Sequence, residues 1–311
     1  MTRLADLAEL VRAPAALSVP GDVLAGAAAA GTLGRRTPAL AGASVLLYWA
    51  GMAANDWADR RLDAVERPER PIPSGRVRPG VALGLAGGLT AAGLAVATAA
   101  GGRRAAAVAL PLAATIWGYD LRAKDTAAGP AVMAACRGLD VLLGASAGRV
   151  GRALPAALTV AAHTWTVTAL SRREVTGVAD RRLPGLTLAG TAVIAATAPG
   201  RPAPPVTGRA AVSDPASRTA RLPGAERVAR FGDLVPAVLA AGYAARYGRA
   251  QARVLADPSP ARVRAAVGAG ITGLPALQGA LTARAGARLL GLAVAGAAPL
   301  GRRLARLISP T

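Results

Sequence analysis

The chain of 311 residues contains one cysteine, one histidine and one phenylalanine, and aromatic residues make up only 3% of it. A single cysteine excludes an internal disulfide and a cysteine-based metal cluster. Because Cys136 lies within a predicted helix, we interpret it as a buried, unreactive thiol. The sequence also lacks a charged leader followed by a short apolar core and a cleavage site, so the first apolar segment is expected to stay as a membrane span.

Acidic residues are scarce as well, with 17 Asp and Glu against 37 Arg and Lys, which gives a net charge of +20. A strongly basic chain first suggests nucleic acid as a partner. The arginines are, however, spread between hydrophobic blocks and do not form one continuous basic face. We therefore expect no nucleic-acid partner.

Hydrophobic residues are abundant: they make up 53% of the chain, and the mean hydropathy is +0.37. Ala, Leu, Val and Gly come in blocks without an amphipathic stripe, which predicts helices that face lipid or one another. The sequence thus predicts an all-α, polytopic transmembrane bundle forming a single domain over residues 1–311. The expected spans are 14–33, 38–54, 80–101, 104–119, 129–148, 153–170, 183–199, 231–247, 265–283 and 285–301.

The eighth predicted span has an alternative interpretation. Because Arg246, Arg249 and Arg253 crowd its end, residues 231–247 could lie on the interface as an amphipathic helix. A true crossing leaves more basic residues on the side of the N-terminus, which the positive-inside rule places in the cytoplasm. The polar segment 199–230, rich in Pro, Ser and Arg, is then expected to be an external loop.

Three carboxylates follow the second apolar block. If the helix continues beyond that block, Asp56, Asp59 and Asp63 fall at i, i+3 and i+7 on one face, with Asn55 beside Asp59. Clustered like charges need a cation, and hard oxygen ligands favour Mg²⁺ shared with substrate phosphates. The pattern predicts a magnesium diphosphate site at a membrane surface. The alternative is a solvated helix end whose acids pair with Arg60 and Arg61.

This segment resembles the first aspartate-rich motif of the UbiA superfamily of intramembrane prenyltransferases, N-D-x-x-D-x-x-x-D followed by R-P-x-P-S-G. The matching positions are Asn55, Asp56, Asp59 and Asp63, and then Arg70, Pro71, Pro73, Ser74 and Gly75. The resemblance covers about residues 10–283. It implies a core of nine spans, so the segment 285–301 would be an additional helix.

The superfamily has a second acidic motif after its sixth span. At that place the chain offers only Glu174 and Asp180, followed by Gly185 and Thr187. The resemblance implies that Glu174 holds a second Mg²⁺, with Asp180 as a ligand or as the partner of an arginine. The alternative is a solvated loop whose acids pair with neighbouring arginines. This departure indicates a divergent branch of the superfamily, such as the EboC-like one.

Weaker resemblances occur at two further segments. Tyr119 and the single lysine, Lys124, match a Y-x-x-x-L-K-R segment, which implies contact with the diphosphate, and a compact ammonium suits that task. Arg137 and Asp140 are similar to an R-G-x-N segment; they either neutralise each other within the fifth span or line the cavity.

The resemblance implies a Mg²⁺-dependent transferase that moves a prenyl group from a prenyl diphosphate to an aromatic or other lipophilic acceptor. It would lie in a bacterial cell membrane with its active-site loops facing the cytoplasm. A terpene cyclase that folds the prenyl cation onto itself, and a membrane transporter or binding protein, are the alternatives. The acids gather at one end of the predicted bundle, which favours an enzyme over a transport pathway.

Overall fold

A computed structural model describes residues 3–13, 18–200 and 234–297, and this part of the chain contains helices and no strand. The elements are α1 (Leu4–Leu10), α2 (Pro20–Ala30), α3 (Thr37–Glu66), α4 (Pro79–Gly118), α5 (Gly129–Gly144), α6 (Leu154–Ser171), α7 (Arg182–Thr197), α9 (Arg249–Ala256) and α10 (Pro260–Arg284). Residues 234–243 are also helical and continue through a π-helix, Ala244–Gly248, into α9. A short apolar helix, Arg288–Ala297, follows α10.

The element α4 consists of two antiparallel helices. Its backbone reverses at Gly102, where φ is 65° and ψ is −155°, a conformation that glycine adopts readily. The indole Nε1 of Trp117 donates to Thr90 Oγ1 at 3.0 Å. Residues 27 positions apart could not touch in one straight helix, which rises about 1.5 Å per residue. The predicted spans 80–101 and 104–119 are therefore confirmed as separate helices.

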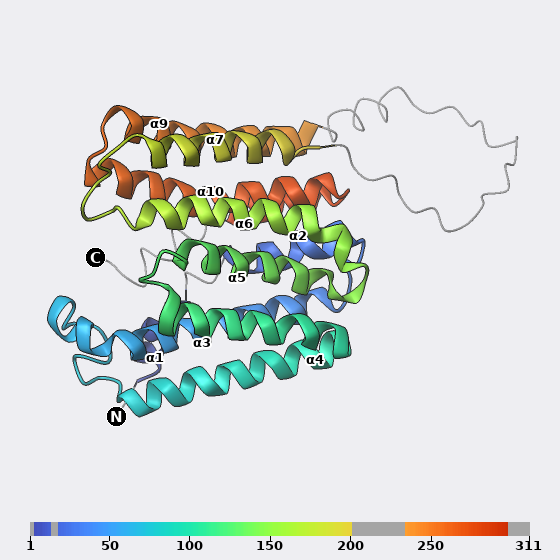
Figure 1. Cartoon of the computed structure of the whole chain (residues 1–311). Coiled ribbons are helices and arrows are strands. Elements are labelled where there is room, and N and C mark those ends of the chain that lie inside the picture. The colour runs from blue at the N-terminus through green and yellow to red at the C-terminus, as the bar shows by residue number, and fades with distance from the viewer. Residues whose placement is uncertain (1–2, 14–17, 201–233, 298–311) are drawn as a thin grey trace, which may run out of the picture.

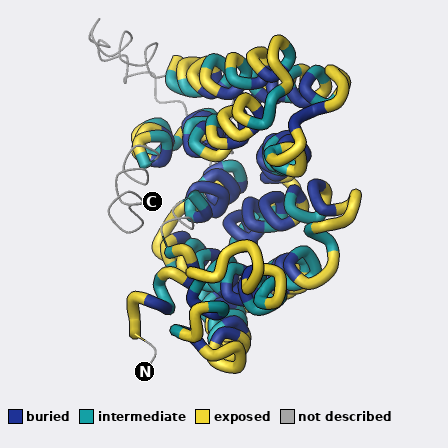
Figure 2. Tube along the Cα trace, turned by 90° about the vertical axis from the view of Figure 1, so that its left-hand side faces the viewer, coloured by how far each residue is buried: buried dark blue, intermediate teal, exposed yellow. Residues whose placement is uncertain are grey.

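The helices lie side by side in a bundle, with α3 and α4 at one edge and α7 and α9 at the other (Figure 1). Buried residues face the interior, whereas exposed ones cover the outside (Figure 2). One apolar cluster joins α2, α5, α6, α7, α9 and α10, and a second joins α3, α4 and α5. A third packs α1 and the loop after α3 against α3 and α4.

Four helical stretches in the described residues are long and apolar enough to cross a membrane: Thr37–Glu66, Pro79–Ala123, Gly129–Ala147 and Val150–Ser171. The second of them contains both helices of α4. Large apolar side chains such as Leu158 and Val193 are exposed on the outside of the bundle, as expected where helices face lipid. The prediction of an all-α membrane bundle is confirmed.

Residues 234–256 form part of the bundle. Tyr243 and Tyr247 are fully buried, and this segment packs along α7 and α10. The segment runs alongside these helices, which favours the predicted crossing over the alternative of an amphipathic helix that lies on the interface. The predicted loop 199–230 falls almost entirely outside the described residues, as do the last residues of the predicted helix 285–301.

Backbone contact between α2 and α5 depends on two glycines. A Cβ added to Gly26 would lie 1.7 Å from the Val141 carbonyl oxygen, and one added to Gly144 would lie 2.0 Å from that of Val23. Small residues permit such close approach of helices in lipid.

We therefore expect Gly26→Ala and Gly144→Ala to lower the melting temperature in detergent, because either methyl group forces α2 and α5 apart. The cost is on the order of 1–3 kcal/mol, as in other overpacked cores. Gly42→Ala is the matched control, since a Cβ there meets nothing within 4 Å. Equal melting temperatures for all three variants would contradict the close-contact account.

Candidate functional site

The helix α3 carries the first acidic motif. It runs without a break from Thr37 to Glu66, so the apolar span and the motif share one helix, as predicted. Its face at i, i+3 and i+7 presents Asp56, Asp59 and Asp63; Asp56 is 4% exposed and Asp63 is 1% exposed. Carboxylates buried this deeply need partners.

Arg70 supplies a cation between two of these carboxylates. Its Nη1 lies 2.6 Å from Asp63 Oδ2 and 3.5 Å from Asp56 Oδ1. The loop that positions Arg70 turns at Gly75, where φ is 76°, and Ser74 Oγ donates to the Arg70 carbonyl at 2.7 Å. The R-P-x-P-S-G segment thus folds back onto the motif, and Asp56 and Asp63 face one point in space.

Lys124 supplies the second cation. Its Nζ lies 3.2 Å from Asn55 Oδ1 and forms an ion pair with Asp59. A π-helix, Tyr119–Ala123, links α4 to Lys124; π-helical turns are rare and frequent at functional sites. The structure therefore brings Lys124 to Asn55 and Asp59, which lie 69 and 65 positions before it in the sequence.

Arg12 is a third cation, which the sequence analysis did not assign to the site. Its Nη2 lies 2.8 Å from Asp56 Oδ1. It is the only residue other than glycine with positive φ in the described part of the chain, at 44°. Such backbone strain concentrates at functional sites. No sequence pattern distinguishes Arg12 from Arg3, the other arginine near the N-terminus.

The short helix α1 positions Arg12. Arg76, in the loop after α3, donates to Glu9 at 2.6 and 2.9 Å and to Asp6 at 2.9 Å. The hydrogen bond from the Arg3 amide, together with the contact from Arg76, lowers the pKa of Asp6. The hydrogen bonds that Arg76 donates to Glu9 and Asp6 raise the pKa of Arg76. These contacts tie α1 to the motif loop.

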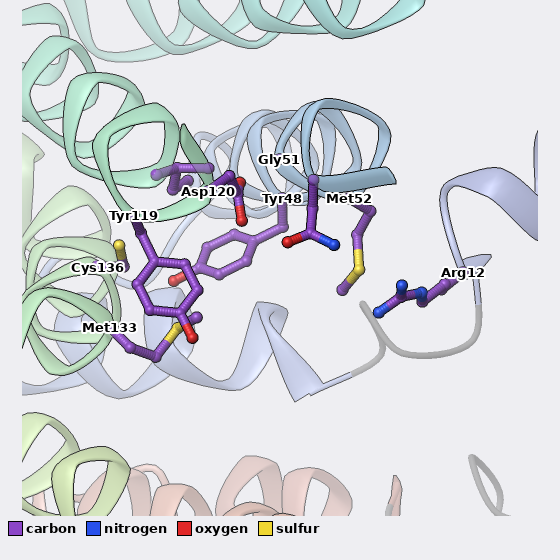
Figure 3. A pocket seen from close by; sticks show the side chains of 10 residues that line it. Arg12, Tyr48, Gly51, Met52, Tyr119, Asp120, Met133 and Cys136 are labelled. Carbon is purple, nitrogen blue, oxygen red and sulfur yellow. The ribbon is translucent and has the colours of Figure 1, made fainter. Parts of the chain in front are cut away.

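A cavity of about 260 Å³ opens beside the motif (Figure 3). Arg12, Asn55, Tyr119 and Asp120 line its polar part. Asp120 is buried. A Cβ at position 51 would lie 3.0 Å from Asp120 Oδ2, so the absence of a side chain at Gly51 leaves room for the Asp120 carboxylate. The sequence motifs did not assign Asp120 to the site.

A second cavity, of about 360 Å³, adjoins the first and extends into the bundle. The two share Tyr48, Met52, Tyr119 and Met133 in their linings. Val167, Val267, Ile271 and Leu274 contribute apolar walls to the second cavity. The first cavity, with Arg12, Asn55 and Asp120 in its lining, thus leads into a predominantly apolar chamber between α3, α5, α6 and α10.

Arg137 lies in the wall of this chamber, away from the first motif. Its Nε is 2.7 Å from Asp22 Oδ2, and its Nη2 donates to the Ser18 carbonyl at 3.3 Å. Asp140 accepts a short hydrogen bond from Ser44. Of the two interpretations given above, an ion pair between Arg137 and Asp140 within α5 is not what the structure shows. Arg137 instead pairs with Asp22 of α2 and lines the chamber.

His163 also lines the chamber, from α6. Its Nδ1 lies 2.9 Å from the Tyr243 hydroxyl, and its ring packs edge-on against Tyr243 and Tyr247. Tyr247 in turn donates to Thr166 Oγ1 at 3.2 Å. This arrangement is that of a packed histidine with a satisfied hydrogen bond, and it ties residues 234–256 to α6.

The second acidic loop lies beside the first motif. Arg172 donates to the Lys124 carbonyl at 3.1 Å, so the loop after α6 contacts the segment that holds Asp59. Glu174 is half-buried and its carbonyl accepts from Arg264 at 2.9 Å. Burial raises the pKa of Glu174, and the Arg264 guanidinium offsets this in part. Asp180 is exposed, and its Oδ1 accepts from the Arg182 amide at 3.0 Å.

The donor set suits a hard divalent ion that is shared with a substrate. Within the described residues, no three acidic, histidine or cysteine side chains form a group that could hold a metal by themselves. Arg12, Arg70 and Lys124 instead contact the acids. Mg²⁺ commonly takes only one or two protein carboxylates and completes its shell with phosphates and water. The residues therefore fit a magnesium diphosphate better than a free metal ion.

The sequence profile of the UbiA prenyltransferase family matches residues 18–201. The chain belongs to this family. Its apolar helices and this membership identify it as an integral membrane protein. The match covers the first motif, the Lys124 segment and the second acidic loop.

Curated relatives are similar over shorter segments. Digeranylgeranylglyceryl phosphate synthase of Natronomonas pharaonis is 44% identical over 85 residues, which are 27% of this chain and 31% of the relative. The synthase of the same name from Methanothrix thermoacetophila is 56% identical over 48 residues, 15% and 18% of the two chains. The bacteriochlorophyll synthase 33 kDa chain of Rhodobacter capsulatus is 68% identical over 25 residues, 8% of each. These alignments span less than a third of each relative.

Two solved structures share the fold. A structure of digeranylgeranylglyceryl phosphate synthase has a TM-score of 0.64 at 16% identity, covering 92% of this chain and 99% of that one. The apo structure of a UbiA homologue from Aeropyrum pernix K1 has a TM-score of 0.55 at 18% identity, covering 86% and 96%. At such low identity the likeness establishes the fold alone.

Proposed function

We propose that this protein is a Mg²⁺-dependent intramembrane prenyltransferase, which moves an isoprenoid group from a prenyl diphosphate to a lipophilic acceptor. One observation carries the proposal. In the carboxylate cluster, Asp56 and Asp63 contact Arg70, and Asp59 contacts Lys124. Through Arg12 and Asn55 this cluster adjoins the first cavity, which continues into the apolar chamber. A substrate with a charged head and a long apolar tail fits that combination.

The cations of the site are suited to hold the diphosphate. Arg12, Arg70 and Lys124 now bond to carboxylates and could donate instead to diphosphate oxygens, while Asp56, Asp59 and Asp63 turn to the metal. Bound Mg²⁺ would neutralise negative charge on the leaving group. Preorganised cations aimed at that developing charge usually provide the largest catalytic contribution. Asn55 and Tyr119 would complete the head-group pocket.

The chamber is suited to the prenyl chain. Its apolar walls would exclude water from the carbon cation that forms when the diphosphate leaves. We propose that Arg137 and Asp140 stabilise the helix packing around the chamber, because Arg137 of α5 pairs with Asp22 of α2 and Asp140 of α5 bonds to Ser44 of α3. The relatives are named for different products, so we leave the acceptor as lipophilic, aromatic or otherwise.

The direct test uses the purified protein in lipid vesicles with geranyl, farnesyl or geranylgeranyl diphosphate and Mg²⁺. Diphosphate release and the lipid products are measured together, by a phosphate assay and mass spectrometry. A prenylated acceptor supports the proposal. A hydrocarbon formed without an acceptor would make the protein a cyclase. Absence of diphosphate release with every donor would contradict both the transferase and the cyclase.

We further propose that Glu174 holds a second Mg²⁺, with Asp180 in a lesser role. Glu174→Gln should then slow turnover about 100-fold, or about 3 kcal/mol, and raise the Mg²⁺ concentration needed. Asp180→Asn should cost less, because its carboxylate bonds to the local backbone. Glu66→Gln, at the exposed end of α3, is the control for loss of a surface carboxylate. Full activity in both loop variants would leave the first motif as the sole metal site.

We place the site on the cytoplasmic side of a bacterial cell membrane. Cysteines replacing Arg78 and Val175 should react with an impermeant reagent only from inside, and one replacing Arg104 only from outside. Val175 is 87% exposed, whereas a side chain at Gly177 would meet the Pro258 carbonyl at 2.7 Å. The wild type, with its buried Cys136, is the control. Labelling of Arg78→Cys and Val175→Cys from opposite sides would contradict the two-motif site.

A further inference from the structure

A groove of about 280 Å³ lies between the 244–256 segment and α10, outside the two cavities of the prenyl site. Four arginines line it: Arg246, Arg249, Arg253 and Arg262. The remaining lining residues are alanines, among them Ala265 and Ala269 of α10. The groove therefore has guanidinium groups around a small-residue floor, and no carboxylate belongs to its lining.

The local fold concentrates these arginines on one face. Arg246 lies in the π-helix Ala244–Gly248, and Arg249 and Arg253 follow it three and seven positions later. Arg262, Ala265 and Ala269 have the same spacing on α10. Residues three, four and seven positions apart share a helix face. Single π-helical turns are frequent at functional sites, and here the turn belongs to the wall of the groove.

The positive charge of the groove is only partly compensated. Arg262 Nε lies 3.3 Å from Asp257, and both side chains are more than half exposed, at 51% and 54%. Arg246 donates to the neutral hydroxyl of Thr272 at 2.8 and 3.1 Å. Arg249 and Arg253 have no ion pair or hydrogen bond among the described residues. Like charges at this spacing repel, so an anion bound between them would stabilise the segment.

The groove lies toward the motif end of the bundle, at its periphery. The Pro258 carbonyl, between α9 and α10, accepts from the Val178 amide of the second acidic loop at 3.1 Å. Arginines near the ends of membrane helices extend toward the phosphate layer. Basic pockets between such helices bind anionic lipid head groups.

We infer that this groove binds the phosphate of an anionic phospholipid, with Arg249 and Arg253 as its principal ligands. A lipid matches the site because the alanine floor accommodates glycerol and acyl carbons beside the phosphate. Its binding would hold the 244–256 segment against α10. The opposite face of α10 supplies Val267, Ile271 and Leu274 to the prenyl chamber, so the lipid would also steady a chamber wall.

The test compares wild-type protein with the double variant Arg249→Gln/Arg253→Gln in detergent. Phosphatidylglycerol, phosphatidylcholine and inorganic phosphate are added separately, and melting temperature and lipid retention by native mass spectrometry are measured. The double variant Arg103→Gln/Arg104→Gln is the matched control, because it removes two exposed arginines at the turn of α4.

Phosphatidylglycerol should raise the melting temperature of wild type and control, and the groove variant should bind it about tenfold more weakly, or about 1.4 kcal/mol. The variant Arg249→Lys/Arg253→Lys should recover part of the effect, which separates lost charge from misfolding. Equal retention in groove and control variants would overturn the inference. Equal protection by inorganic phosphate and phosphatidylglycerol would also overturn it, because the site would then recognise free phosphate.

Discussion

Asp56→Asn should reduce diphosphate release about 1,000-fold, equivalent to about 4 kcal/mol of transition-state stabilisation. The Asp56 carboxylate contacts both Arg12 and Arg70, so its charge organises two of the three cations that contact the first motif. An amide of the same shape cannot neutralise either guanidinium or share a divalent ion with the diphosphate. The stabilisation of the protein by Mg²⁺ with diphosphate should weaken in the same variant.

Asp125→Asn is the control for this experiment. Asp125 is an exposed acid next to Lys124, and the substitution is chemically identical but lies outside the carboxylate cluster. Its turnover should stay within about twofold of wild type, as is usual for surface changes. Asp56→Asn turnover within tenfold of Asp125→Asn, in a protein that elutes and melts like wild type, would contradict the assignment of the first motif.

The first motif could be predicted in detail because its geometry is local. Helical periodicity alone places Asp56, Asp59 and Asp63 on one face. This prediction required only that the helix continue beyond the apolar block, as α3 does. The hydrophobic blocks likewise predicted the helices, since burial in lipid demands continuous apolar stretches. The pairing of Lys124 with Asp59 joins residues 65 positions apart. The family resemblance singled out Lys124 for the diphosphate site, but it did not predict this ion pair.

Other parts of the site depend on contacts that local patterns do not encode. Arg12 reaches Asp56 because α1 is tied down through Arg76, and one arginine among many carries no signal of that contact. Arg137 has an acid three positions away in its own helix, yet it pairs with Asp22 of α2. The packing of the helices decides which partner Arg12 and Arg137 meet. Helices rich in small residues can pack in many ways that fit the same sequence pattern.

The second acidic loop shows a different limit. Its sequence could be aligned with the superfamily, and Arg172 does place it beside Lys124. The roles of Glu174 and Asp180 depend on side-chain directions in an irregular loop, which periodicity does not predict. Asp180 bonds to the backbone at the start of α7, as short acidic side chains often do at helix starts. Glu174 is the better candidate ligand because no other side chain is bonded to its carboxylate in the described structure.

Lys124→Gln should lower kcat about 100-fold, or about 3 kcal/mol, and change KM less. The ammonium contacts Asn55 and Asp59, so its charge lies beside the proposed diphosphate pocket. If it then donates to the departing diphosphate, its contribution grows as negative charge develops there, and such a contribution appears in kcat. Loss of ordinary substrate binding would instead raise KM.

Two further variants test whether catalysis depends on the position of the Lys124 ammonium as well as on its charge. Lys124→Arg keeps the charge, but a planar guanidinium on a longer side chain cannot reproduce a compact ammonium between Asn55 and Asp59, so we expect only partial recovery. Arg122→Gln removes an exposed positive charge from the π-helix that precedes Lys124 and should leave turnover nearly unchanged. Equal effects of Lys124→Gln and Arg122→Gln would show that Lys124 contributes only to the general positive potential. A full recovery in Lys124→Arg would mean that charge suffices, because the compact geometry seen at Asp59 would then carry no rate advantage.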